Sequence, residues 1–337
     1  MSIIPIEVPT GAIRYNTDSN KMECFDGTKW MQVAVSEAIT TSSRGIACGG
    51  YRRPGDDNVN IVQYVNIATR GNFLDWGDLT DARRRTFCLG NRVNVFCTGG
   101  MDENNNLINI IDKGLFATSG SFVDYGDLTA TTESHGGCSD NTRGVLAGGD
   151  TPSEVNTIQF FALSSGGGAQ DFGDLTATKD APSGSGSSIR GIFSGGQTSP
   201  SVLATIDYIT IQSTGNGVDF GDLTQARRHA AAASNPIRSV NMGGATPSDV
   251  NTIDYITIAT TGDAKDFGDL TEPRISLGAF ANSTRAVAFG GDTSPGLTPT
   301  TDYVEIPTTG NALDFGDLVN SNQFQNISGC SNSHGGL

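Results

Sequence analysis

Pairs of aspartates three residues apart are the most frequent groups in this sequence that could do chemistry. The first pair, Asp75 and Asp78, lies in the stretch Asp-Trp-Gly-Asp-Leu-Thr, and related stretches follow along the chain. Two carboxylates with neighbouring carbonyls suit Ca²⁺, which takes about six to eight oxygen ligands. An aspartate can instead accept backbone N–H bonds in a tight turn. We expect the structural role, with no metal and no cofactor, and the sequence leaves calcium binding open.

Other residues with catalytic potential lack their usual partners. His135, His229 and His334 are the only histidines, and none has the local spacing of a zinc site or a catalytic triad. Several copies of the aspartate stretch read Asp-Phe-Gly, as in protein kinases, but the other kinase signatures are missing. Gly184-Ser185-Gly186 lacks the third glycine of a dinucleotide site. We therefore expect no enzyme and no catalytic residue, although a triad assembled in space remains an alternative.

Six scattered cysteines predict buried thiols rather than a disulfide framework, because none lies in a Cys-x-x-Cys pair. Cys88 and Cys97 could face each other on adjacent strands, and their spacing does not decide whether they are bonded.

The net charge of −15, from 36 acidic and 21 basic residues, would repel nucleic acid and anionic membranes. We therefore expect no nucleic-acid partner. The sequence contains no apolar stretch long enough for a transmembrane helix, and its start lacks the features of a signal peptide. We expect no membrane insertion and synthesis in a cytoplasm.

The aspartate stretch is one landmark of an internal repeat with a period of 47 to 49 residues. Its copies begin at Asp75, Asp124, Asp171, Asp219, Asp266 and Asp314, the last with Val319 in place of threonine. A Gly-Gly pair ends a short apolar run in each unit, and these pairs begin at Gly49, Gly99, Gly148, Gly195, Gly243 and Gly290. Such a period is typical of repeat folds, whose units bury their apolar faces against one another.

Further positions keep the same frame. An arginine precedes five of the Gly-Gly pairs, at Arg44, Arg143, Arg190, Arg238 and Arg285. A basic residue follows the aspartate by eight positions at Arg83, Lys179, Arg227 and Arg274, whereas Thr132 and Asn322 break this rule. In the second unit Asn94 replaces the arginine, and Lys113 replaces an aromatic residue that the other units share. We expect these repeated residues to be structural, with the arginines binding oxygens of a neighbouring unit.

The order of arginine, Gly-Gly, tyrosine and aromatic residue resembles the kelch repeat over residues 37–337. The resemblance implies an all-β fold, a six-bladed β-propeller of about 48 residues per blade. One blade should be composite, because the last unit ends one strand short while the chain start has an unpaired strand at 44–48. We expect a strand near Phe324 to Cys330 to pair with it. Kelch folds include both enzymes and binding proteins, so the fold alone does not give the function.

Residues 1–36 precede the repeat and predict a small β segment, with strands at 12–16 and 21–25 and a turn before Trp30. The pattern from Gly11 through Arg14, Tyr15 and Phe25 to Trp30 resembles a segment of phage tail-fibre and other virion structural proteins. This resemblance implies attachment to other virion proteins through these residues, and a homo-oligomer such as a trimer. The alternative is an ordinary β-extension packed on its own propeller.

The loops after the Gly-Gly pairs differ between units and carry polar residues such as Arg52, Arg53, Asn104 and Asn105. A rigid scaffold presents variable loops as a recognition surface, although they could also be simple solvated turns. We expect a virion structural protein of a tailed phage that displays a propeller for attachment, decoration or recognition of a host-surface glycan or protein. The alternatives are a particle-borne glycan-active enzyme and a cellular kelch-type scaffold.

Overall fold

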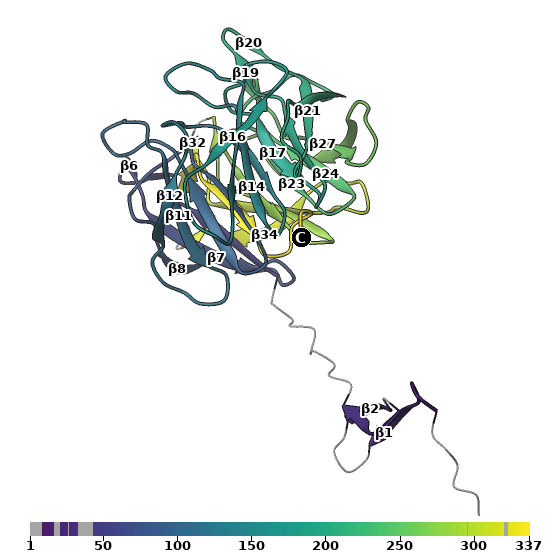
Figure 1. Cartoon of the computed structure of the whole chain (residues 1–337). Coiled ribbons are helices and arrows are strands. Elements are labelled where there is room, and N and C mark those ends of the chain that lie inside the picture. Colours follow the sequence, from purple (N-terminus) through teal and green to yellow (C-terminus); the bar gives the residue numbers. More distant parts are fainter. Residues whose placement is uncertain (1–8, 17–20, 26, 33–42, 295, 320–322) are drawn as a thin grey trace, which may run out of the picture. The chain divides into compact units, whose positions relative to one another are not determined.

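The computed structural model describes residues 9–16, 21–25, 27–32, 43–294, 296–319 and 323–337. The chain divides into two compact units, Met1–Thr41 and Ser42–Leu337. The described residues form strands and turns and contain no α-helix, which confirms the all-β prediction (Figure 1). Accordingly, the described part has no helix with the length and apolarity needed to cross a membrane.

The first unit contains a three-stranded antiparallel sheet, as the sequence predicts. Its strands are β1 (Ile13–Asn16), β2 (Lys21–Phe25) and β3 (Trp30–Gln32). Arg14 donates to Glu23 at 2.8 Å, and its guanidinium lies 4.2 Å from the centre of the Trp30 ring. The ring of Phe25 lies 5.4 Å from that of Trp30, so side chains on neighbouring strands hold this small sheet together.

The second unit is built from four-stranded antiparallel sheets, six of which lie within the described residues. The first is β36–β4–β7–β8 (Ser328–Ser331, Arg44–Cys48, Ile61–Asn66, Leu74–Asp78), and the second is β9–β10–β11–β12 (Phe87–Gly90, Asn94–Thr98, Ile110–Leu115, Val123–Asp127). The third is β13–β14–β15–β16 (Gly136–Ser139, Arg143–Ala147, Thr157–Ala162, Gln170–Asp174), and the fourth is β17–β18–β21–β22 (Ser183–Gly186, Arg190–Ser194, Thr205–Thr210, Val218–Asp222). The fifth is β23–β24–β27–β28 (Ala231–Ser234, Arg238–Met242, Thr252–Thr257, Lys265–Asp269), and the sixth is β29–β30–β33–β34 (Gly278–Ala281, Arg285–Phe289, Thr300–Glu305, Leu313–Asp317).

Short strands complete the fold, and all but β35 lie in the loops after the Gly-Gly pairs. They are β5 (Tyr51–Arg53) and β6 (Asp57–Asn58) with β35 (Gln323–Gln325), β19 (Gln197–Thr198) with β20 (Ser201–Val202), β25 (Ala245–Thr246) with β26 (Ser248–Asp249), and β31 (Asp292–Thr293) with β32 (Gly296–Leu297).

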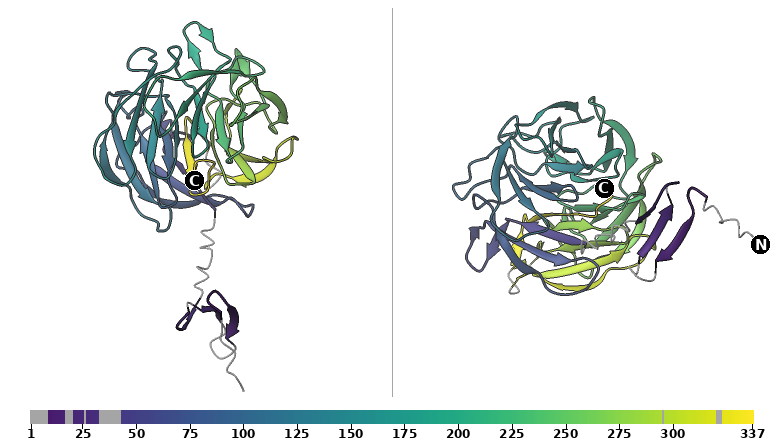
Figure 2. Two further views of the ribbon diagram at one scale, coloured as in Figure 1. Left: turned by 45° about the vertical axis from the view of Figure 1, so that its right-hand side comes forward. Right: turned by 60° about the horizontal axis from the view of Figure 1, so that its bottom comes forward.

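The first strands of the six sheets contact one another in cyclic order, from β9 through β13, β17, β23 and β29 to β36 and back to β9. They surround a common centre (Figure 2). Small residues such as Gly, Ala and Ser dominate these strands, which allows close approach. The predicted composite sheet is confirmed, because β36 pairs antiparallel with β4 and Ser328 lies opposite Cys48.

The aspartate stretch forms the fourth strand of each sheet and joins it to the next sheet. In β8, Trp76 is buried while Asp75 faces solvent, so the aromatic residue packs inside. The carbonyl of Trp76 accepts a bond of 2.9 Å from the N–H of Gly120 in the second sheet. In the last sheet the carbonyl of Phe315 accepts from Gly71 in the first sheet, at 3.1 Å. The same contact therefore also links the last sheet to the first.

Glycine is required in this stretch by close packing. At Gly316, φ is +147°, and a Cβ would lie 2.6 Å from the carbonyl oxygen of Gly71. Any larger residue would push the last sheet away from the first.

A buried polar node joins each aspartate stretch to the third strand of the next sheet. In the first node, Thr80 donates through its N–H and its hydroxyl to Asp112, and Arg83 forms an ion pair of 2.6 Å with the same carboxylate. Equivalent fully buried pairs are Lys179–Asp207, Arg227–Asp254 and Arg274–Asp302. Burial lowers the pKa of Lys179, Arg227 and Arg274, and the paired aspartates oppose that shift. Each charge therefore depends on its partner.

Two nodes are neutral on both sides. Thr132 replaces the basic residue in the third sheet's node, where Gln159 replaces the aspartate and accepts from Thr129. In the closing node, Gln63 of β7 accepts from the N–H of Val319 at 2.9 Å. Asn322 lies outside the described residues. The carbonyl of Phe324 accepts from the N–H of Gly291, as the carbonyl of Arg83 accepts from Gly50. Phe324 therefore takes the place of the basic residue in the closing node. In each node, the acceptor on the third strand and the residue at the basic position are thus either both charged or both neutral.

The arginine that precedes five of the Gly-Gly pairs bridges neighbouring sheets, as expected from the sequence. Arg190, for example, donates to the carbonyl of Ile258 in the next sheet, and Arg285 donates to Ile67 in the first sheet. In the second sheet, where Asn94 replaces the arginine, the hydroxyl of Tyr125 donates instead to the carbonyl of Ala162 at 2.7 Å. This explains how the second unit departs from the repeat without losing the bridge.

Exchanging a charged node for a neutral one tests this rule. Asp254→Gln alone should lower the free energy of unfolding by about 3–5 kcal/mol, because it leaves the Arg227 guanidinium buried without its counter-charge. Adding Arg227→Thr recreates the pair found at Thr132 and Gln159 and should recover most of that loss. Urea unfolding of the single and double variants measures both values. A double variant no more stable than the single one would contradict the pairing rule.

Candidate functional site

Six residues, one before the first strand of each sheet, form a closed ring of backbone hydrogen bonds. They are Arg85, Ser134, Ala181, His229, Ser276 and Asn326, and all have φ between 51° and 59°. Each N–H donates to the carbonyl of the ring residue before it, over 2.8 to 3.4 Å, and Arg85 closes the ring by donating to Asn326. Left-handed backbone costs a non-glycine residue about 1–2 kcal/mol, so these bonds and the packing must hold it in place.

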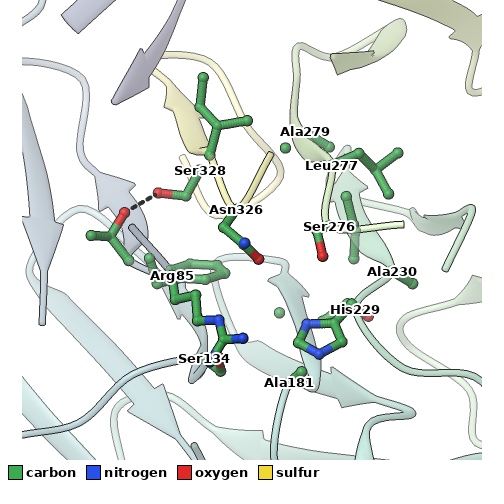
Figure 3. A pocket seen from close by; sticks show the side chains of 18 of the residues that line it. Arg85, Ser134, Ala181, His229, Ala230, Ser276, Leu277, Ala279, Asn326 and Ser328 are labelled. Carbon is green, nitrogen blue, oxygen red and sulfur yellow. Dashed lines mark hydrogen bonds between the residues drawn. The ribbon is translucent and has the colours of Figure 1, made fainter. Parts of the chain in front are cut away.

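The ring surrounds an opening on the axis of the sheets. A cavity of about 100 Å³ lies among the ring residues and the first strands. A wider hollow of about 400 Å³ shares Arg85, His229, Ser276 and Asn326 with that cavity. Figure 3 shows these four side chains around one opening. A concave site with several convergent polar groups is the usual form of a ligand site.

Charged and amide side chains fill the positions next to the ring. Arg85 forms an ion pair of 2.6 Å with Glu133, which is almost fully buried. Arg228 donates to the amide oxygen of Gln197 at 2.8 Å, and the amide nitrogen of Gln197 donates to Asp180 at 3.0 Å. The amide thus connects a cation and a carboxylate and fixes the positions of both.

Burial shifts the protonation of two of these groups. It lowers the pKa of His229 to about 4, and the positive charges of Arg85 and Arg228 act in the same direction. Burial also raises the pKa of Asp180 to about 6, and the charge of Asp150 adds to this, while Arg85 opposes it. At neutral pH His229 is therefore a neutral imidazole, with one donor and one acceptor nitrogen.

The other end of the axis is filled by residues 332–337. His334 makes a hydrogen bond of 2.9 Å with the carbonyl of Gly90, and Gly335 donates to the carbonyl of Ser234 at 2.9 Å. These carbonyls belong to the ends of β9 and β23, on the second and fifth sheets. The segment thus joins strands across the axis, and the ring end is the open one.

His135 lines the cavity but is fixed within the core. Its Nε2 lies 2.9 Å from the hydroxyl of Thr98, which itself donates to the carbonyl of Phe87. The hydroxyl must therefore accept the proton of Nε2, and Nδ1 is buried without a partner among the described residues. Burial accordingly lowers the pKa of His135 to about 4.

The predicted buried thiols are confirmed for five of the six cysteines, and Cys24 is half-buried. Cys88 and Cys97 face each other in register on β9 and β10, and both are free. Across the ranges that the structure describes, no group of His, Cys, Asp and Glu side chains has the arrangement of a metal site.

The recognition residues expected from the sequence lie in the loops and are partly engaged there. Arg52 pairs with Asp57, and Arg53 pairs with Asp56. The amide oxygen of Asn105 accepts from Arg84, which lies beside the opening, while the N–H of Asn104 donates to Asp102. In the leader, Tyr15 lies opposite Met22, and its side chain is outside the described part. The Gly-Gly pairs serve the contacts between sheets. The repeated aspartates are exposed on the fourth strands, and Asp124 accepts a local bond from the N–H of Gly126.

Sequence reasoning missed the ring, although a signal was present. In five units the ring residue follows the repeated aspartate by ten positions, between the basic residue and the first strand. Its type varies among arginine, serine, alanine, histidine and asparagine, while its surroundings repeat. A variable position inside a constant frame is what a recognition site on a repeat scaffold produces.

Replacement of His135 by glutamine tests its environment. The His135 imidazole takes up a proton below about pH 6.5 in the unfolded state but only near pH 4 in the native state. The native state therefore becomes less stable relative to the unfolded state as the pH falls between these values. The loss amounts to about 3 kcal/mol. Glutamine can still donate to Thr98, so the pH dependence of the unfolding free energy between pH 7 and 4 should become shallower by that amount. An unchanged slope would contradict the neutral assignment.

Comparison with known proteins assigns no family to this chain. No protein-family model matches it, and no curated protein matches it. The functional interpretation therefore depends on the geometry of the opening and on the residues of the two units.

Proposed function

We propose that this chain is a six-bladed, kelch-like β-propeller that acts as a recognition protein on the surface of a phage particle. The cyclic contacts among the first strands support six blades around one axis. The pairing of β36 with β4 supports closure by a composite blade. Both features agree with the repeat period in the sequence, which independently favours this fold.

The single observation that carries the recognition role is the polar opening. A constant framework holds five residue types at the same position of the six sheets, namely arginine, serine, alanine, histidine and asparagine. Structural positions keep one residue type in most units, whereas this position varies. A rigid rim with varied chemistry is suited to binding one partner and rejecting others.

The first unit is proposed to attach the protein to other virion proteins. Three strands of three to five residues bury too little surface to be stable alone, so the segment needs a partner or another copy of itself. Its resemblance to tail-fibre segments favours a virion partner and a homo-oligomer such as a trimer. The particle would then be the protein's location, after synthesis in the host cytoplasm.

A glycan-active enzyme is the second candidate, because the charge of Asp150 acts on Asp180, which directly precedes the ring residue Ala181. The raised pKa of Asp180, about 6, suits a general acid, and a second carboxylate could act beside it. Shortening of an oligosaccharide by the purified protein, abolished by Asp180→Asn, would favour this alternative over simple binding.

Removal of residues 1–41 tests the attachment role. Full-length and truncated chains, each with a tag, would be expressed in cells that produce the particles. We expect mass spectrometry of purified particles to find the full-length chain and not the truncated one, because the truncated chain lacks its attachment segment.

Equal thermal unfolding of the sheet unit in both forms is the control for folding. Incorporation of both forms, or of neither, would contradict attachment through this segment.

A further inference from the structure

We infer that the axial opening binds an acidic group, a carboxylate, sulfate or phosphate, on the molecule that the protein recognises. This inference depends on the proposed recognition function and specifies the chemistry of its ligand. It stands on the charges around the hollow, on the way those charges are held, and on the donors that face the opening.

The hollow has the opposite charge balance to the whole chain. Arg84, Arg85 and Arg228 line it, and Asp292 is the only carboxylate among its lining residues in the described part. The full chain has 36 acidic and 21 basic residues, so a local excess of arginine is unusual for this protein. A concave surface with one sign of charge concentrates ligands of the other sign.

Two of the three arginines are held by neutral oxygens. Arg228 donates to the amide oxygen of Gln197, and Arg84 donates to that of Asn105 at 3.0 Å. No ion pair of Arg84 or Arg228 occurs within the described ranges, whereas the basic residues of the buried nodes all have one. The amides orient the two guanidinium groups without cancelling their charges, which leaves positive charge for a ligand.

The remaining groups at the opening can also donate hydrogen bonds. Besides Arg85, the side chains of Ser276, His229 and Asn326 surround the same space (Figure 3). A hydroxyl, an imidazole N–H and an amide NH₂ can each donate to an oxyanion. Together with the guanidinium groups they offer more donors than a carboxylate or sulfate needs.

Acidic neighbours make the binding depend on pH. The carboxylates near His229 and the arginines are Glu133, which pairs with Arg85, and Asp150, Asp180 and Asp292. As the pH falls from 7 to 5, Asp180 takes up a proton, because its pKa is about 6, and its repulsion of an anion decreases. A bound anion also favours the protonated form of His229. The affinity for an acid should therefore rise over this range.

Titration calorimetry with defined probes at low salt tests the inference. The probes are inorganic sulfate, inorganic phosphate, sialyllactose, a heparin-derived disaccharide and neutral lactose. We expect at least one acidic probe to bind more tightly than lactose, and the tightest one identifies the source of the acidic group. Binding should strengthen from pH 7 to 5. Equal or absent binding of all five probes would overturn the inference.

Two variants locate the site. Arg228→Gln should weaken the acidic probe about tenfold or more, the loss expected for one charged hydrogen bond. Arg92→Gln is the matched control, because Arg92 is exposed in the turn between β9 and β10, at the end of β9 away from the ring. This variant should bind the acidic probe as tightly as the unaltered protein does. Equal binding by Arg228→Gln and the unaltered protein would place the anion elsewhere.

A double variant guards against misfolding. Arg85→Gln with Glu133→Gln removes a cation and its counter-charge together, so the net charge stays the same, and a melting curve checks the fold. Weaker acid binding by this variant supports the site, and unchanged binding contradicts it. If no acid binds while the full-length chain still enters particles, the acidic ligand is wrong and the proposed function stands.

Discussion

The buried node between neighbouring sheets is the interaction on which the rest of this structure depends. A side chain on the third strand accepts a hydrogen bond from the residue that ends the preceding aspartate stretch, as Asp112 does from Thr80 and Gln63 does from Val319. Because Gln63 lies in the first sheet and Val319 follows the last, the same contact runs through the whole set. Where the acceptor carries a charge, a buried cation balances it. Removal of one partner would leave the other charge buried and unpaired, which strongly destabilises a protein.

Much of the fold could be predicted from the sequence because repetition exposes it. The strands, the composite sheet and the bridging arginines followed from the positions of Gly-Gly, arginine and the aspartate stretch. The neutral nodes did not, because Gln63 and Gln159 carry no recognisable motif, and two extra residues before Phe324 shifted the frame at the closure. The basic position and its acceptor on the third strand of the next sheet lie about 30 residues apart, as in Arg227 and Asp254. Their pairing becomes visible only when the sheets are assembled.

The candidate site was harder to predict because the chemistry is spread over the chain. Arg85 and Asn326 are hydrogen-bonded neighbours in the ring but are separated by most of the sequence. Their left-handed backbone has no signature in residue type, since serine, alanine and histidine share it with asparagine. The loops expected to recognise a partner also help to hold the charged rim, as Asn105 does for Arg84.

Amide hydrogen exchange at the six ring residues is the most direct test of the claim that the sheets close on one another. In a closed ring the N–H groups of Arg85, Ser134, Ala181, His229, Ser276 and Asn326 open only together. We predict that all six exchange slowly and with the same free energy, close to that of global unfolding. If Arg85 and Asn326 exchanged much faster than the other four, the first and last sheets would separate readily and the account of closure would be wrong.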